Sequence, residues 1–329
     1  TASAVWNFVD FVSEGRVDAV PHINNKGLLS LKRVPKDSYY YYQAVLAETP
    51  MVKIAPVQYD LRAGIEEQEG DGFCKKEIWV YTNTNEFTLF HNGRRVETRK
   101  NPGPKELFTI PFVNGKNTFE VVAASEKGEV RDYQEVMFVL YPRVLKINNT
   151  PQSININAGA SFYFTDNEGN LWLPDKPYEK GTWGYMDGEI LERENWIGRL
   201  PGADNNILLT ENDPLYQTQC LNIGTYKFDV PDGVYELTFY FADLMTARNL
   251  NLLPADLESI DGIADPSEFD ILVNGKIVKA NLNLREDYGM TKAIKFKYRL
   301  ISENNQGIEI RFLKKNGVPV LNALSLTRK

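Results

Sequence analysis

Residues Asp213–Asp243 read DPLYQTQCLNIGTYKFDVPDGVYELTFYFAD, and this stretch decides the fold class of the chain. Its first half alternates apolar residues with polar ones from Tyr226 to Val230, as expected of a strand with one buried face. The alternation resumes from Tyr235 to Phe241, after a Pro-Asp-Gly turn signal. We therefore expect a β-hairpin whose large apolar face is covered by a second sheet, in a mainly β protein built from sandwiches.

Length and composition limit the classes of function. The chain has 329 residues, of which 43% are hydrophobic and 25% charged, so two or three domains with real cores are expected. A net charge of −7 and the lack of a basic stripe argue against a nucleic-acid partner. No apolar run approaches the ~18 residues that a membrane helix needs, so we expect no membrane span. Two cysteines and two histidines at scattered positions predict no disulfide framework, no metal and no cofactor.

Residues 50–143 read as a compact all-β domain. About seven short apolar runs are separated by turn signals, a pattern typical of an immunoglobulin-like β-sandwich. Asn92-Gly93 is the strongest of these signals, because both residues tolerate a positive φ. We expect Asn114-Gly115 to form a second hairpin turn in the same domain.

The second half of the chain, residues 151–329, resembles the malectin family of carbohydrate-binding β-sandwiches. The matching motifs, in order, are INAG ending at Gly159, DPLYQT with the run that follows it, FDILVNG at Phe269–Gly275, GIEIRF at Gly307–Phe312 and VPVLNALSL at Val318–Leu326. Their number and order make the resemblance specific. It implies a malectin-like, galactose-binding-like jelly roll over this half.

The first 48 residues resemble the end of the catalytic barrel of glycoside hydrolase family 2, the β-galactosidase group. The matches are VWNF at Val5–Phe8, NKGL at Asn25–Leu28, RVPKD at Arg33–Asp37 and the run Tyr39–Gln43. Residues 1–48 are thus expected to form a strand, a loop and a helix from the tail of an incomplete (β/α)8 barrel, with the helix stopped by Pro50. In that family both catalytic glutamates lie on earlier barrel strands, so we expect no catalytic residues here and an inactive chain on its own. The resemblance also implies an exported bacterial protein, periplasmic or secreted.

The malectin resemblance supplies candidate carbohydrate-binding residues on four loops. The loops are Phe162–Phe164, Trp183–Asp187, Asp213–Thr218 and Arg248–Gly262, the last within a long insertion at Asn249–Pro266. The candidate residues are Trp183, Tyr185, Tyr216, Asp213, Asn157 and Asn322. Trp183 or Tyr185 would be the platform under a sugar ring, with Asp213 or Asn322 bonding its hydroxyls. The alternative is that these motif residues, Tyr216 and Asn157 above all, hold the loops together.

Two classes of function remain open from the sequence. In the first, the chain is the non-catalytic C-terminal region of a β-galactosidase-like hydrolase, and its malectin-like module binds an oligo- or polysaccharide. In the second, the module packs on the parent barrel or on another subunit and binds no sugar. The aromatic pair that the family carries after DPLYQT is reduced here to Gly224-Thr225-Tyr226, so the diglucose specificity of malectin does not transfer. A galactoside ligand follows only from the parent enzyme.

Overall fold

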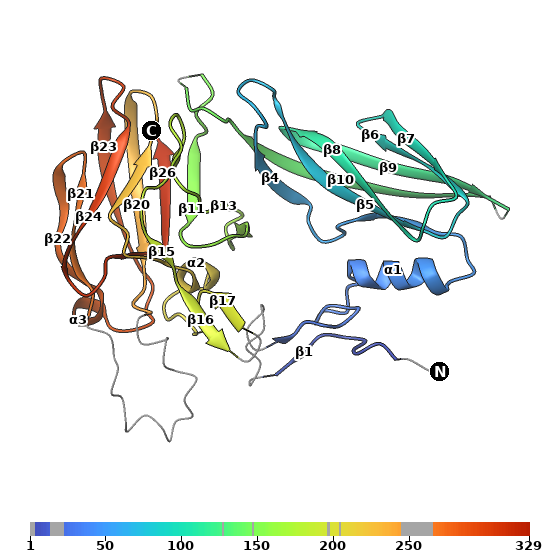
Figure 1. Ribbon diagram of the computed structural model, residues 1–329, viewed down its shortest axis with the longest axis horizontal. Coiled ribbons are helices and arrows are strands. Elements are labelled where there is room, and N and C mark those ends of the chain that lie inside the picture. The colour runs from blue at the N-terminus through green and yellow to red at the C-terminus, as the bar shows by residue number, and fades with distance from the viewer. Residues whose placement is uncertain are drawn as a thin grey trace. The chain divides into compact units, whose positions relative to one another are not determined.

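The computed structural model describes residues 4–13, 23–126, 128–146, 148–195, 198–203, 205–244 and 266–329. The predicted loop Arg248–Gly262 and almost all of the Asn249–Pro266 insertion lie outside these residues. The chain divides into two compact units, Thr1–Arg143 and Val144–Lys329 (Figure 1). No helix among the described residues has the length and apolar character needed to cross a membrane.

The first unit begins with a short irregular segment and a helix. Strands β1 (Phe11–Val12) and β2 (Ile23–Asn24) pair in antiparallel register, and helix α1 (Asp37–Leu46) follows them. The Asp37 carboxylate accepts a hydrogen bond from Val57 N at 2.9 Å, which fastens the start of the helix to the chain beyond it. The expected helix before Pro50 is therefore present and ends four residues earlier.

Two sheets make up the rest of the first unit. Their strands are β3 (Val52–Ala55), β4 (Leu61–Ile65), β5 (Phe73–Thr82), β6 (Glu86–His91), β7 (Arg94–Lys100), β8 (Lys105–Val113), β9 (Gly115–Ser125) and β10 (Gly128–Tyr141). One sheet has the order β4-β10-β9-β6-β7 and the other β3-β5-β8. Side chains from both sheets share one apolar core, in which the rings of Phe112 and Phe138 lie 5.1 Å apart.

One of the two predicted hairpin turns in this unit is confirmed and the other is wrong. Asn92 and Gly93 adopt φ values of 50° and 74° and join β6 to β7, which pair in antiparallel register. Asn114-Gly115 instead carries the chain from one sheet to the other, because β8 pairs with β5 while β9 pairs with β6 and β10. Gly115 at φ 91° makes the sharp change of direction, and Asn114 Oδ1 accepts a hydrogen bond from Leu140 N.

The second unit is built on two larger sheets (Figure 1). The six-stranded sheet, in spatial order, contains β12 (Phe164–Thr165), β13 (Leu171–Pro174), β11 (Ser153–Asn157), β26 (Ala323–Arg328), β20 (Gly233–Phe241) and β23 (Ile294–Ser302). The five-stranded sheet contains β14 (Trp183–Tyr185), β19 (Thr225–Phe228), β24 (Ile308–Asn316), β21 (Glu268–Val273) and β22 (Lys276–Asn283). The rings of Phe241 in β20 and Phe269 in β21 are 6.0 Å apart, so the inner faces of the two sheets pack on each other.

Short elements complete the described part of this unit. They are the sheet of β15 (Glu189–Ile190), β18 (Cys220–Leu221) and β25 (Val320–Leu321), the pair β16 (Glu192–Asn195) and β17 (Gly198–Pro201), and the helices α2 (Pro214–Gln217) and α3 (Leu284–Tyr288). Helix α2 lies within the DPLYQT motif, Asp213–Thr218. Its position next to the six-stranded sheet matters for the site described below.

The expected hairpin around Pro231-Asp232-Gly233 is wrong. The strand before the turn, β19, pairs with β14 and β24 in the five-stranded sheet, and the strand after it, β20, pairs with β23 and β26 in the six-stranded sheet. The turn therefore connects two facing sheets, and the apolar faces of β19 and β20 bury each other. The residues of these faces are all at most 1% exposed: Tyr226, Phe228, Tyr235, Leu237, Phe239 and Phe241.

Candidate functional site

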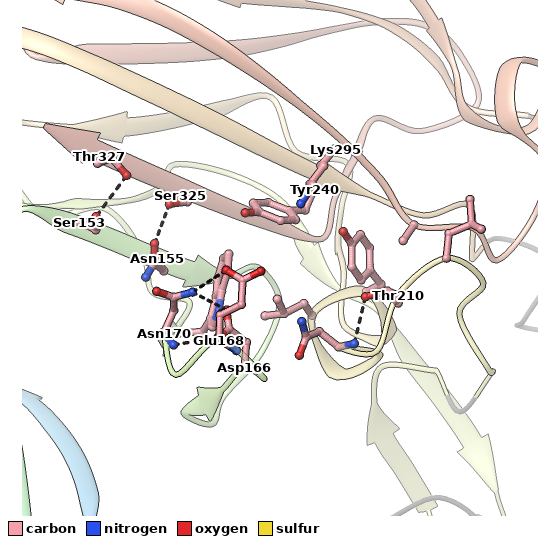
Figure 2. Close-up of a pocket in the computed structure, with 16 residues that line it drawn as sticks. Ser153, Asn155, Asp166, Glu168, Asn170, Thr210, Tyr240, Lys295, Ser325 and Thr327 are labelled. Carbon is pink, nitrogen blue, oxygen red and sulfur yellow. Dashed lines mark hydrogen bonds between the residues drawn. The ribbon is translucent and has the colours of Figure 1, made fainter. Parts of the chain in front are cut away.

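A pocket of about 250 Å³ opens on the outer face of the six-stranded sheet of the second unit (Figure 2). Strands β11, β26, β20 and β23 contribute to its lining, together with the turn between β12 and β13 and the segment 209–216 that runs into helix α2. Two hydrogen bonds link this turn to the segment 209–216: Asn167 N donates to Asn212 Oδ1, and Asn167 Nδ2 donates to Glu211 O, both at 3.0 Å. The pocket is therefore held by neighbours that are distant in sequence.

The floor of the pocket is polar because strand side chains alternate between faces. On β11 and β26, Ser325 Oγ bonds Asn155 Oδ1 at 2.6 Å, and Ser153 and Thr327 share a hydrogen bond of 3.2 Å. The odd-numbered residues of β20 point into the core, so the outward positions place Tyr240 on the pocket side. These contacts fix a hydroxyl- and amide-rich surface beside one aromatic ring.

Tyr240 is held by two buried aromatic neighbours. Its ring centroid lies 5.1 Å from that of Trp172, at an interplanar angle of 88°, and 6.1 Å from that of Tyr216. Such edge-to-face contacts fix ring orientation while leaving part of the ring open. Trp172 and Tyr216 are 3% and 4% exposed, whereas Tyr240 is half-buried. Burial, reinforced by the charges of Asp166 and Glu168, raises the pKa of Tyr240 to about 12, so its phenol stays protonated at neutral pH.

The acidic side of the pocket is a tight turn, DNEGN, between β12 and β13. Asp166 accepts four hydrogen bonds there: from Glu168 N at 3.0 Å, Asn170 N at 2.8 Å, Asn170 Nδ2 at 3.0 Å and Trp172 Nε1 at 2.9 Å. Burial alone would raise the pKa of Asp166, but the hydrogen bonds from Trp172, Asn170 and Glu168 together outweigh burial and lower it. Asp166 and Asn170 Nδ2 are thus committed to the protein, whereas the Glu168 carboxylate and Asn170 Oδ1, on exposed residues, can accept from a ligand.

One predicted residue, Tyr216, lines this pocket, and two more support it from behind. Asn322 makes four hydrogen bonds: its Nδ2 donates to Tyr216 O (2.7 Å) and Thr218 O (2.8 Å), and its Oδ1 accepts from Gln219 Nε2 (3.0 Å) and Ala242 N (2.9 Å). Asn157 accepts from Thr218 Oγ1 at 2.7 Å. Both asparagines are fully buried, so they position helix α2 and cannot reach a ligand.

Asp213 also serves the local backbone. Its Oδ1 accepts a hydrogen bond from Ile207 N at 2.6 Å, and its carbonyl accepts from Tyr216 N and Gln217 N at the start of α2. This ties the segment before α2 into a closed loop. The residue is half-buried and does not line the pocket.

Trp183 and Tyr185 lie on the five-stranded sheet and do not contribute to this pocket. They stand opposite Phe228 and Tyr226 in the register of β14 and β19. Trp183 is 1% exposed, and Lys176 Nζ lies 5.0 Å from its ring centroid. The platform role expected of Trp183 is not available in this structure, because core packing and the lysine cover its ring. Tyr185 is half-buried and keeps part of its surface open.

Sequence reasoning missed most of the pocket, namely Asp166, Glu168, Asn170, Trp172, Tyr240 and Lys295. A signal for Tyr240 was present: it is an aromatic residue at the outward position of an alternating strand, where polar residues are the rule. The DNEGN turn carried a second signal, since Asp and Asn readily bond their own backbone. Among the described residues, no group of three or more His, Cys, Asp or Glu side chains is arranged to hold a metal ion.

Fold and site together define a mainly β module with an aromatic and amide-rich pocket on the outer face of one of two facing sheets. The sequence model of the family "Malectin domain" matches residues 152–324, more than half of the chain. The chain belongs to this family.

Larger relatives extend the similarity beyond the malectin domain. The crystal structure of a Bacteroides uniformis β-glucuronidase matches 98% of this chain at 32% identity with a TM-score of 0.82. A structure of B. uniformis β-glucuronidase 2, covalently bound to cyclophellitol-6-carboxylate aziridine, matches at 31% identity with a TM-score of 0.81. A curated Formosa agariphila protein named "Putative beta-glucuronidase" is 28% identical over 227 residues, which are 67% of this chain.

The chain spans only part of these relatives: 36% of the first B. uniformis chain and 23% of the Formosa protein. It therefore resembles the C-terminal portion of family 2 β-glucuronidases over most of its length. These relatives carry the β-glucuronidase name, whereas the sequence motifs suggested the β-galactosidase group of the same family. The comparisons confirm the expected similarity to a family 2 glycoside hydrolase and the expected malectin domain.

Proposed function

We propose that the chain is the non-catalytic C-terminal region of a β-glucuronidase-type glycoside hydrolase and that its malectin domain binds a carbohydrate in the pocket on the six-stranded sheet. The observation that carries this proposal is the half-buried Tyr240, locked edge-on between Trp172 and Tyr216 beside exposed Glu168 and Asn170. Carbohydrate sites combine an apolar ring with fixed hydrogen-bonding groups, and this pocket supplies both.

The chemistry of binding follows from the polar groups that face the pocket. The protonated Tyr240 phenol can donate to a sugar oxygen, while the Glu168 carboxylate and Asn170 Oδ1 can accept from sugar hydroxyls. Leu209, 78% exposed at the rim, offers apolar contact to a C–H face. A volume of about 250 Å³, just below the usual range of roughly 300–1,000 Å³ for small-molecule sites, suits one sugar residue of a longer chain.

The proposal includes a domain organisation: residues 1–48 as the tail of a (β/α)8 barrel, residues 50–143 as an immunoglobulin-like spacer and residues 151–329 as the malectin-like jelly roll. The boundary between the two compact units at Arg143 and Val144 supports the separation of spacer and jelly roll. The facing sheets and shared core of the first unit support a sandwich there. In the parent enzyme, the module would hold a glucuronide-bearing glycan near a catalytic barrel.

A glycan array followed by calorimetry on each hit tests the binding proposal. We expect the wild-type chain to bind a defined set of oligosaccharides and Tyr240→Ala to lose at least about tenfold in affinity, because truncating a central aromatic residue of a binding site costs about 2 kcal/mol or more. Tyr133→Ala is the matched control, since this 56% exposed tyrosine lies in the other unit. Silence across the array, with a folded chain, would refute carbohydrate binding.

A second candidate function is packing against the parent barrel, and exposed apolar side chains near the N-terminus favour it. Trp6 is 74% exposed, Val12 68% and Leu46, at the end of α1, 73%. Such surface is costly in water and is characteristic of a contact face. Leu46→Asp should weaken association with a separately produced β-glucuronidase barrel, as followed by size-exclusion chromatography. If the wild-type chain and the barrel elute separately when mixed, the two do not associate, and this role is refuted.

A further inference from the structure

Lys295 is an uncommitted cation in the pocket. It occupies an exposed position on β23 and stands directly opposite Tyr240 in the strand register, and it contributes to the pocket lining (Figure 2). Within the part of the chain that the structure describes, Lys295 forms no ion pair. Lys297, two residues further on the same face, differs in this respect, because its Nζ lies 3.0 Å from Glu236 Oε1.

The acidic side of the same pocket does not neutralise Lys295. Asp166 is saturated by four internal hydrogen bonds, and the Glu168 carboxylate has only a long contact of 3.4 Å with Asn170 Nδ2. Neither carboxylate pairs with Lys295 in the structure. Lys295 lies beside Tyr240, and Glu168 lies apart from them next to Asn170 (Figure 2), so the pocket has a cationic end at Lys295 and an accepting end at Glu168.

We infer that the pocket selects an acidic sugar, a uronic acid whose carboxylate binds Lys295 while its ring hydroxyls bond Glu168 and Asn170. This inference rests on the proposed carbohydrate binding. A neutral hexose could use only the accepting end and would leave Lys295 solvated, whereas a uronate of the same ring size engages both ends. The Tyr240 phenol, protonated at neutral pH, is a further donor for the carboxylate or the ring oxygen.

The test compares two ligands that differ only at C6, methyl β-D-glucuronide and methyl β-D-glucoside, titrated into the full chain and followed by NMR. We expect the wild type to prefer the glucuronide by about fivefold, the size of a partly exposed ion pair. Lys295→Gln should bind the two ligands equally, and Lys295→Arg should keep the preference. Raising the salt concentration should narrow the preference in the wild type.

Lys297→Gln is the matched control, because it removes a lysine from the same strand and face outside the pocket. It should leave the preference unchanged. Equal binding of both ligands by the wild type would overturn the uronate inference and leave carbohydrate binding intact. A preference that persists in Lys295→Gln would overturn the role of Lys295. Binding of neither ligand, together with a silent glycan array, would remove the proposed function as well.

Discussion

Asp166 shows at the residue scale how a single side chain can organise a pocket. Its two oxygens bond the backbone of the DNEGN turn, the amide of Asn170 and the indole of Trp172, and Trp172 in turn packs edge-on against Tyr240. The half-buried ring in the pocket therefore depends on a carboxylate that does not itself meet the ligand. Ligand affinity and local stability should be coupled through this residue.

Asp166→Ala should destabilise the second unit by about 2 kcal/mol, because it leaves the buried Trp172 Nε1 and the turn amides without their acceptor. The lowered pKa of Asp166 means that its contribution is fully present above the unfolded value near 3.9 and is lost as the pH falls through the folded value. Denaturant unfolding of wild type and variant from pH 7 to pH 2 should show the difference shrinking below pH 4. Glu168→Gln, at an exposed position of the same turn, is the control and should leave stability unchanged.

The pKa of Asp175 is shifted in the opposite direction to that of Asp166. Burial raises its pKa to about 6, although hydrogen bonds from Gly159 N, Tyr226 Oη and Lys176 N partly offset the effect of burial. The folded state then holds this proton more tightly than the unfolded state, so stability falls as the pH rises from about 4 to about 6, by at most roughly 3 kcal/mol. Asp175→Asn should abolish this fall in unfolding experiments across that window. The same fall in the variant would assign the titration to another group.

At the scale of elements, turn chemistry and strand alternation predicted strands well and their partners poorly. Pro231-Asp232-Gly233 and Asn114-Gly115 do reverse the chain, but each connects two sheets where a hairpin was expected. A turn signal reports only local backbone geometry, and both arrangements satisfy it. The choice depends on which apolar face covers which, and this is a property of long-range packing. Tyr240 was missed for the same reason, since its pocket neighbours come from β13 and α2.

The INAG motif illustrates a structural role that the sequence pattern did not distinguish from a binding role. Asn157 bonds Thr218, and Gly159 adopts φ 70° against the backbone of Gln219. A Cβ at Gly159 would lie 2.4 Å from Gln219 O, so no other residue fits this crossing between β11 and the chain after α2. Motif asparagines and glycines here set the position of α2, and through it the position of Tyr216.

Gly159→Ala should therefore destabilise the protein by about 3 kcal/mol or more, because the variant has both a disfavoured positive φ and a backbone clash. Gly169→Ala is the matched control: this glycine has φ 83°, but a Cβ would meet nothing within 4 Å, so only the conformational cost of about 1–2 kcal/mol applies. Thermal unfolding of both variants measures the difference. Equal losses would show that the contact with Gln219 relaxes without cost.

At the scale of the whole molecule, the order of motifs predicted the malectin domain and the relation to a larger hydrolase. The motifs of residues 1–48 resemble family 2 as a whole, so they did not separate its β-galactosidase group from the β-glucuronidase name that the relatives carry. Of the two carboxylates that line the pocket, Asp166 accepts hydrogen bonds from the protein itself, and Glu168 is exposed.

All sixteen lining residues of the pocket belong to the unit Val144–Lys329, which also has facing sheets with their own buried aromatic contacts. A fragment of residues 144–329 should therefore fold and bind the same oligosaccharides as the full chain, with an affinity within about twofold, because no group that meets the ligand is removed. Circular dichroism would confirm the β structure of the fragment, and calorimetry with an array hit would measure its affinity. A folded fragment without affinity would show that residues of the first unit complete the site. Tyr240→Ala should lower the affinity of the fragment as much as it lowers that of the full chain. An equal loss would assign binding in both proteins to the same pocket.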